Sequence, residues 1–336
     1  MRVRLPSLLV STVSVVVPVH RCEPYVEAAL ASVLAQTHPV HEIVLVDDRG
    51  DDDSMRTATA FLSARGAPFT AVTHATNLGP GTARNTGLAA STGELVWFLD
   101  ADDTADPHFV ATLAAALRDS GADLAACRTQ RLDGDGAVLG IDEPTYPAAI
   151  TTGPEFARLL LRGGAKAYPC TKLFRRSALG ERPWDEGRHY EDIAATFRIA
   201  LASGLVALVD DPLYSYLLRS GSITTTLSER TLDLFAVGAD VADAVAAAGL
   251  AGEWADDLRG FVYREVLTSI AHVAMRADHA ATAPRDLYRT AITRVRDRID
   301  WAELPALART GHVREAVFGA LVSVAPSAYS AVLRFR

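Results

Sequence analysis

The sequence predicts an α/β protein in which a mostly parallel sheet is followed by an α-helical region. Two observations support this fold class. In the first half of the chain, short runs rich in β-branched residues alternate with segments of helical periodicity. After about Ser222 these runs stop, and the remaining alanine-rich chain is divided by glycine and proline into helix-sized pieces. We therefore expect a sheet domain at residues 1–225 and a helical region at 226–336.

The first strand is expected at Val13–Val17, a continuous β-branched run ended by Pro18, as in a strand that is buried on both faces. A helix follows from about Pro24, where proline suits the first turn, to Gln36. Further strands are expected at Glu42–Val46, Phe69–Thr73 and Leu95–Leu99, and helices at Asp53–Arg65, Gly81–Ser91 and Asp106–Asp119. Single helices between strands predict right-handed crossovers and parallel pairing.

Beyond Ala122 the pattern changes. A hairpin is expected up to Ile141, around a turn at Asp133–Gly136. A helix at Glu191–Ser203 and short strands at Val206–Val209 and Leu213–Leu217 complete the sheet domain. In the helical region, breaks are expected near Gly249, Pro284, Pro305 and Pro326.

The composition excludes several classes of protein. With 49% hydrophobic and 22% charged residues, the chain is neither disordered nor collagen-like. A net charge of -8 argues against nucleic acid as a partner, because binding a polyanion requires clustered cations. Cys22, Cys127 and Cys170 lack zinc-site spacing. No apolar run reaches the roughly 18 to 20 residues that span a bilayer, and no signal peptide is recognised. We expect a cytoplasmic protein.

Acidic residues follow two of the predicted strands. The second strand ends in Asp47-Asp48, and the fourth is followed by Asp100-Ala101-Asp102-Asp103. Ligands of open α/β sheets bind at the carboxyl ends of the strands, and carboxylates gathered there repel one another unless a cation lies between them. Mg²⁺ or Mn²⁺ with a diphosphate is the natural candidate. Helix capping explains Asp51–Asp53 and Asp106 better, whereas Asp100 and Asp102, two residues apart, favour the ligand role.

Several segments together resemble a known family. They are VSVVVPVHRCEPYVEAALASVLAQT, EIVLVDD, NLGPGTARNTGLAASTGELVWFLDADD, CTKLFRRSAL, YEDIAATFRIAL and YLLRSGSIT. In this order and spacing they are similar to the family 2 glycosyltransferases, which have the Rossmann-like GT-A fold. The resemblance covers about residues 12 to 225. It implies inverting transfer of a sugar from a nucleotide-diphosphate sugar to an acceptor hydroxyl.

The resemblance also implies roles for residues at the strand ends. Nucleotide-sugar binding falls to Pro18, Val19, His20, Asp48, Asn77, Arg84, Asp100 and Arg219. Asp48 would bond the base, and Arg84 would bind phosphate or hold Asp100 in place, unless it is a helix-surface arginine. Asp100 and Asp102 match the Asp-X-Asp element that binds Mn²⁺ or Mg²⁺, and Asp103 is close enough to share the metal. Arg219, in RSGSIT, could instead belong to a solvated turn.

Asp192 matches the position of the catalytic base. An acceptor hydroxyl has a pKa far above neutrality, so a carboxylate must take its proton as the new bond forms. The metal would neutralise the departing diphosphate. The alternative role for Asp192 is an ordinary helix cap. Lys172 and Arg175 could brace the acceptor, although a strand-edge lysine explains the pair equally well.

Two rival functions remain open. A sugar-phosphate nucleotidyltransferase shares this architecture, but such enzymes usually carry a glycine-rich, basic loop after the first strand, where this chain has PVHRCEP. A non-catalytic nucleotide- or sugar-binding protein is the second rival. His20 and Arg49-Gly50 depart from the family pattern, so the donor could be of UDP, dTDP or GDP type. The acceptor could be a glycan, a glycolipid or a small molecule.

The last segment, Val313 to Leu333, carries Val317, Leu321 and Val324 with basic residues at both ends. It could lie on the inner face of a membrane as a peripheral contact. Packing as a core helix, or a homo-oligomer interface, is favoured by its weakly charged polar face and by Pro326.

Overall fold

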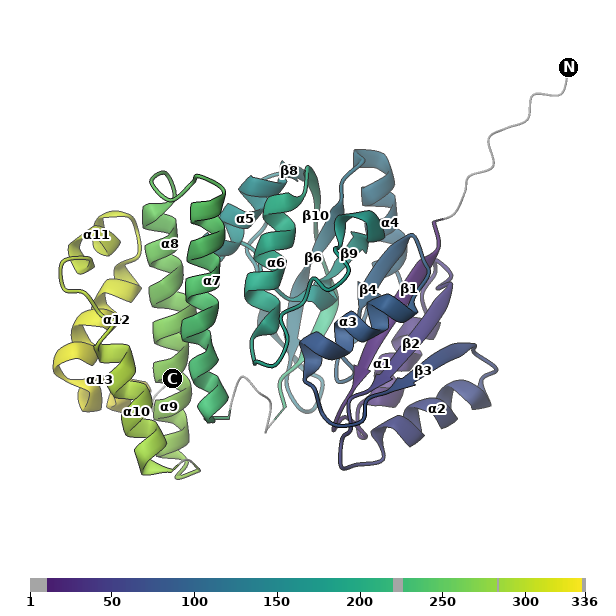
Figure 1. Ribbon diagram of the computed structural model, residues 1–336, viewed down its shortest axis with the longest axis horizontal. Helices are drawn as coiled ribbons and strands as arrows, with labels where there is room; N and C mark the ends of the chain where they lie inside the picture. The colour runs from purple at the N-terminus through teal and green to yellow at the C-terminus, as the bar shows by residue number, and fades with distance from the viewer. Residues whose placement is uncertain (1–10, 220–225, 283, 334–336) are drawn as a thin grey trace, which may run out of the picture. The chain divides into compact units, whose positions relative to one another are not determined.

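The computed structural model describes residues 11–219, 226–282 and 284–333 (Figure 1). The chain forms two compact units. The first takes the chain up to Gly153 together with Tyr168–Glu186 and Ala202–Leu217, and it holds the sheet. The second takes Pro154–Ala167, Gly187–Leu201 and the chain from Leu218 onward, and the described part of it is helical. The α/β fold class is confirmed, and the division at residues 225 and 226 stays a prediction.

The first half of the chain folds as its pattern predicts. Its elements are β1 (Val13–Val19), α1 (Val26–Leu34), β2 (Glu42–Asp47), α2 (Ser54–Ala64), β3 (Phe69–Thr73), α3 (Pro80–Ala90), β4 (Leu95–Phe98) and α4 (Phe109–Ser120). The strands pair in parallel in the order β3-β2-β1-β4. β1 lies between two partners, which explains its continuous apolar sequence.

The sheet continues from β4 through β9 (Lys172–Arg175), β6 (Leu124–Leu132) and β10 (Leu205–Leu217) to β5 (Thr104–Ala105). β7 (Val138–Ile141) pairs with β6 as the predicted hairpin, and β8 (Ile150–Thr152) pairs with β10. The two short strands expected at the end of this part form one strand, β10, with a shift of register between Val209 and Tyr214.

Lys172 does not lie at a strand edge, because β9 is antiparallel to both β4 and β6 in the middle of the sheet. Its Nζ is buried and donates to the carbonyl oxygen of Tyr168 at 2.7 Å. Arg175 donates from Nε to the carbonyl of Ala122 at 2.7 Å and from Nη2 to that of Leu117 at 2.9 Å, at the end of α4. Both cations therefore satisfy backbone carbonyls of the sheet unit.

Aromatic side chains fill the core on both faces of β4. On one face, Trp97 stacks on Phe109 of α4 with ring centroids 4.4 Å apart. On the other face, Phe98 makes an edge contact with Trp184 at 5.0 Å. Trp97 and Phe98 point to opposite sides because successive residues of a strand alternate.

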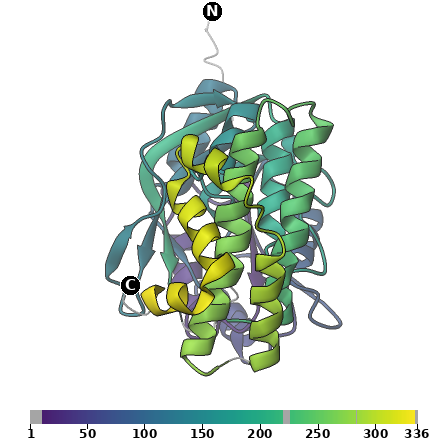
Figure 2. The same cartoon turned by 90° about the vertical axis from the view of Figure 1, so that its left-hand side faces the viewer.

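The second unit is built from α5 (Gly153–Arg162), α6 (Glu191–Ala202) and the C-terminal helices (Figure 2). The latter are η3 (Glu229–Leu232), α7 (Asp233–Ala247), α8 (Ala255–Phe261), the π-helical η4 (Val262–Thr268), α9 (Ser269–His279), α10 (Arg285–Arg296), α11 (Leu304–Arg309), α12 (Val313–Val324) and α13 (Pro326–Leu333). The predicted breaks separate these helices. Within the described residues, no helix is both long and apolar enough to cross a membrane.

A charge cluster joins two helices of this unit that are far apart in the sequence. The carboxylate of Asp257 in α8 accepts from Nε of Arg158 and from Nε of Arg162 in α5, each at 2.7 Å. These two guanidinium groups lower the pKa of Asp257 despite its desolvation, which acts in the opposite direction.

Gly87 tests the packing of α3 on the sheet. A Cβ at this position would lie 2.2 Å from Cγ1 of Val16 in β1. We expect Gly87→Ala to lower the free energy of unfolding by about 1–3 kcal/mol through overpacking. Urea unfolding measures the change. Gly180→Ala is the matched control, because a Cβ there meets nothing within 4 Å, and an equal loss in both variants would contradict the prediction.

Candidate functional site

The carboxyl ends of three parallel strands lie together in the first unit. Val19, the last residue of β1, is in register with Asp47, the last residue of β2. Val16 of β1 is in register with Phe98, the last residue of β4. The predicted nucleotide-binding residues of the first half of the chain lie in or after these strands, except Asn77, which follows β3, and Arg84, which lies on α3. Pro18 and His20 are half-buried in or just after β1, whereas the side chain of Val19 is buried.

Asp48 holds the loop that follows β3. Its carboxylate is almost fully buried. Oδ1 accepts from the backbone N–H of Leu78 at 2.8 Å and lies 2.7 Å from Nδ1 of His74, while Oδ2 accepts from the N–H of Gly79 at 2.9 Å and from Nδ2 of Asn77 at 3.1 Å. A buried carboxylate with several donors is stable only while they stay in place. Asp48 therefore fixes the position of Asn77.

His20 joins the same group. Its Nδ1 lies 3.1 Å from Nδ2 of Asn77 and 3.2 Å from the carbonyl oxygen of Asp48, to which Asn77 also donates at 2.9 Å. The structure thus brings together three predicted residues from three separate loops. Sequence reasoning missed His74, which connects Asp48 to α3. Its Nδ1 contacts Asp48, and its Nε2 lies 2.9 Å from Oγ1 of Thr86 in α3. The only sequence signal for His74 was a histidine directly after a strand.

Arg84 is braced against Asp100. The arginine is buried on α3, and its Nη2 donates to Oδ1 of Asp100 at 2.8 Å. The side chain of Asp100 remains 28% exposed. The surface-arginine alternative is therefore wrong, and Arg84 fixes the orientation of the first carboxylate after β4. A charge-assisted bond of this kind is stronger than a neutral one.

Asp103 is tied to β10. Its Oδ2 accepts from the hydroxyl of Tyr214 at 2.8 Å and its Oδ1 accepts from the N–H of Leu217 at 2.8 Å. Burial raises the pKa of Asp103 well above its ordinary value, and the charges of Asp102 and Asp100 add to this effect. Asp102, by contrast, is half-buried.

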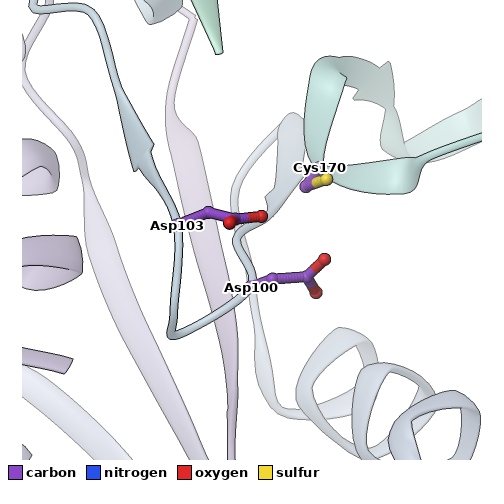
Figure 3. A group of neighbouring side chains, drawn as sticks. All are labelled: Asp100, Asp103 and Cys170. Carbon is purple, nitrogen blue, oxygen red and sulfur yellow. The ribbon is translucent and has the colours of Figure 1, made fainter. Parts of the chain in front are cut away.

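Figure 3 shows Asp103 pointing toward the sulfur of Cys170, with Asp100 beside them. One potential ligand atom from each of these three residues lies within 4.8 Å of the other two. Burial, followed by the nearby Asp100 and Asp103 carboxylates, raises the pKa of the Cys170 thiol well above its usual value. Cysteine sulfur is a soft ligand, whereas Mg²⁺ and Mn²⁺ prefer carboxylate oxygen. The donor set that suits a hard divalent cation is therefore the more exposed pair, Asp100 and Asp102.

Asp192 lies in the second unit, in the first turn of α6. The residue before this helix, Tyr190, has φ 59. Asp192 is half-buried, and Glu191 beside it is buried. The N–H groups at the start of a helix favour negative charge, so this position stabilises an ionised carboxylate. Arg219, also assigned to this unit, is half-buried two residues after β10, and its neighbours Ser220 and Ser222 lie outside the described residues.

Unusual backbone geometry marks the predicted residues. Among the described residues, four that are not glycine have positive φ: Arg21 (47), Arg49 (53), Tyr190 (59) and Ala281 (53). The first three adjoin His20, Asp48 and the Glu191-Asp192 pair. Such conformations cost about 1–3 kcal/mol each and gather at functional sites. This observation supports the choice of these loops independently of their side chains.

The mostly parallel sheet followed by helices agrees with a GT-A fold, and comparison with known proteins identifies the family. The family model described as Glycosyl transferase family 2 matches residues 14–182, about half of the chain. The chain therefore belongs to glycosyl transferase family 2. The expected glycosyltransferase class of enzyme is confirmed, which disfavours the nucleotidyltransferase and the non-catalytic binding protein.

Among curated proteins, glycosyltransferase GlyG of Streptococcus pneumoniae is 29% identical over 222 residues, which are 64% of this chain and 73% of GlyG. The match covers between 52% and 73% of the length of GlyG and of three further curated glycosyltransferases.

Two solved structures share the fold at low sequence identity. TarS 1–349 of Staphylococcus aureus, in complex with UDP-GlcNAc, has a TM-score of 0.64 and 19% identity, with 93% of this chain and 90% of that chain covered. Mannosyltransferase PcManGT of Pyrobaculum calidifontis, in complex with GDP-Man and Mn²⁺, has a TM-score of 0.50 and 17% identity, with 96% and 86% covered. The expected GT-A fold is confirmed.

Substitution of Asp48 tests its role in holding the loop. Asp48→Asn removes the negative charge and replaces one acceptor oxygen by a donor, so we expect a loss of about 2–3 kcal/mol in the free energy of unfolding. Asp47→Asn is the control, since Asp47 accepts from the N–H of Arg49 at 2.9 Å and lies 3.7 Å from its guanidinium. Its loss should stay below about 1 kcal/mol. If both variants lose the same free energy of unfolding in thermal or urea unfolding, Asp48 does not hold the loop more firmly than Asp47 does.

Proposed function

We propose that this protein is an inverting glycosyltransferase that moves a sugar from a nucleotide-diphosphate sugar to an acceptor hydroxyl, assisted by a divalent metal. The observation that carries the proposal is the gathering of His20, Asp48, Asn77 and Asp100 at the carboxyl ends of parallel strands in the first unit. In an open α/β sheet this edge is where a ligand binds. Family membership makes glycosyl transfer the reaction class.

The nucleotide would bind over the loops after β1 and β3. Pro18 and Val19 end β1, His20 begins the first loop, and Asp48 positions Asn77 in the second. Because two groups already contact each oxygen of the Asp48 carboxylate, Asp48 would bond the base only by exchanging one of these partners, and it would otherwise act by positioning Asn77. TarS binds UDP-GlcNAc and PcManGT binds GDP-Man, which supports a donor of UDP, dTDP or GDP type.

Asp100 and Asp102 would hold the metal. Both carboxylates retain exposure, unlike Asp103, and oxygen ligands suit either Mg²⁺ or Mn²⁺. A cation bound there would supply Lewis-acid neutralisation of the diphosphate. Arg84 contributes by keeping Asp100 in one orientation, so that less side-chain freedom is lost on binding. Mn²⁺ in the PcManGT complex supports a metal of this kind.

Asp192 would act as the general base. It lies in the first turn of α6, where the helix N-terminus favours the ionised carboxylate that a base requires. It would take the proton of the acceptor hydroxyl while the acceptor oxygen forms a bond to the anomeric carbon and the bond to the nucleotide diphosphate breaks. A single displacement of this kind inverts the anomeric centre. Arg219 would contact the donor diphosphate.

The acceptor is a glycan, a glycolipid or a small molecule, and the acceptor side has no residue assigned to it in this proposal. A cytoplasmic location also remains a prediction, as does a homo-oligomer formed through the helical C-terminal region.

Substitution of Asp192 tests the base. We expect Asp192→Asn to lower kcat by about 10² to 10⁴-fold, because an amide cannot accept the proton. Binding of the nucleotide with Mn²⁺, followed by calorimetry, should be unchanged. The control is Asp243→Asn, an exposed carboxylate on α7 of the same unit, which should transfer at the parent rate. Transfer by Asp192→Asn at that same rate would rule out the assignment.

Substitution of Asp102 tests the metal site. We expect Asp102→Asn to weaken Mn²⁺ binding in the presence of UDP or GDP by at least about ten-fold, since one of few anionic ligands is lost. The shift of melting temperature with Mn²⁺ concentration reports this affinity. Asp119→Asn, which alters an exposed ion pair with Arg118 on the same unit, is the control. An unchanged Mn²⁺ response in Asp102→Asn would remove this residue from the site.

A further inference from the structure

The outward face of α12 is apolar. The exposed side chains of this helix are Val313, Arg314, Val317, Leu321 and Val324, so one of the five is charged. The four aliphatic residues are spaced by four, four and three positions, which places them on one stripe of the helix. The opposite face packs inward through Ala316, Phe318, Gly319 and Val322. A helix that meets only water usually carries polar residues on its outer face.

An exposed tryptophan lies close to this stripe. Trp301 is 55% exposed. It lines one groove together with Arg296 at the end of α10 and Ser323 of α12, the neighbour of Val324. Nη2 of Arg296 donates to the carbonyl oxygen of Ser323 at 2.9 Å, which ties the groove together. Trp301 therefore lies beside α12, next to the face that carries Ser323. We group it with the stripe and call the set the α12 surface: Val313, Val317, Leu321, Val324 and Trp301.

The exposed charges of the last helices are mostly positive, unlike those of the whole chain. Between Arg285 and Leu333 there are seven arginines, and all seven are exposed. They are Arg285, Arg289, Arg294, Arg296, Arg298, Arg309 and Arg314. The same segment has five acidic residues, of which three are exposed, whereas the protein as a whole has a net charge of -8. Of these arginines, Arg314 lies on α12 and Arg296 lines the groove with Trp301, which Asp297 lines as well. No exposed side chain of α12 is acidic.

We propose that the α12 surface docks on a lipid bilayer that contains anionic headgroups. An amphipathic helix can lie in the plane of the interface with its apolar face among the acyl chains and arginine among the headgroups. Tryptophan is enriched at this level of the membrane, and each nearby arginine adds attraction to anionic lipid. Docking of this kind needs no helix that crosses the bilayer, and it is independent of the proposed transfer reaction.

A second copy of the chain fits the α12 surface less well. A stable interface buries about 800 Å² on each partner, and α12 offers only a single stripe about 18 Å long. In a two-fold symmetric contact the same patch meets itself. Arg296 and Arg314 of both copies would then be gathered within one small interface, and like charges would oppose association. An anionic bilayer offers acyl chains to the apolar stripe and negative headgroups to the arginines.

The full-length protein can be tested with vesicles of phosphatidylcholine alone or mixed with phosphatidylglycerol. We expect co-sedimentation with the mixed vesicles only, and weaker binding as salt screens the charges. Trp301 provides a direct probe because Trp97, Trp184 and Trp254 are all buried. Its fluorescence should shift to shorter wavelength on binding, and Trp301→Phe should abolish that shift.

Variants identify the surface. The double variant Val317→Asp, Leu321→Asp should lower vesicle affinity by at least about ten-fold, and Arg314→Glu by at least about five-fold. Val138→Asp, at an exposed apolar residue of β7, should bind as the parent does. If the double variant unfolds, Val324→Ser replaces it, since this side chain is 69% exposed and should still weaken binding measurably.

Three results would overturn the proposal. One is a folded parent protein that does not co-sediment with the mixed vesicles. Another is binding that the α12 variants leave intact. The third is a dimer in light scattering that the double variant dissociates, because the α12 surface would then be an interface between two copies.

Discussion

The candidate site depends on one electrostatic constraint: carboxylates that follow neighbouring parallel strands must each be compensated. The sheet unit meets this constraint separately for each carboxylate. Asp48 receives backbone and side-chain donors from the loop after β3, Asp100 receives a buried guanidinium, and Asp103 receives a tyrosine hydroxyl and a backbone N–H of β10. Because each compensation comes from a different element, the carboxylates also fix the positions of those elements.

This arrangement gives the three carboxylates of the loop after β4 distinct roles. Asp103 is buried, and its raised pKa reflects desolvation and like charge; its bonds join the loop to the strand that leads toward Arg219. Asp100 and Asp102 keep contact with solvent and therefore remain suited to a ligand. Cys170 stands beside them as a small apolar group, because its buried thiol is held protonated.

The helical unit contributes two features of different kinds. Its first turn at Asp192 follows a residue with positive φ, a conformation that persists only where surrounding structure enforces it. Its last helices hold an apolar stripe and exposed arginines, whereas Arg158 and Arg162 of α5 pair with the largely buried carboxylate of Asp257. Exposed valines add nothing to the packing of a helix bundle, so we interpret the α12 surface as an interaction surface.

The sequence by itself determined the parallel strands of the first half, the helix breaks at Gly249 and Pro305, and the family, because β-branched runs, helical periodicity and strand-end aspartates are local patterns. It did not predict β9, which is too short and too basic to look central, nor the fusion of two short runs into β10. Only the tertiary structure decided that Arg84 pairs with Asp100, that His74 supports Asp48, and that Asp103 rather than Asp102 is buried. These outcomes depend on which elements become neighbours, since a side chain's partners and its desolvation are set by residues far away in the chain.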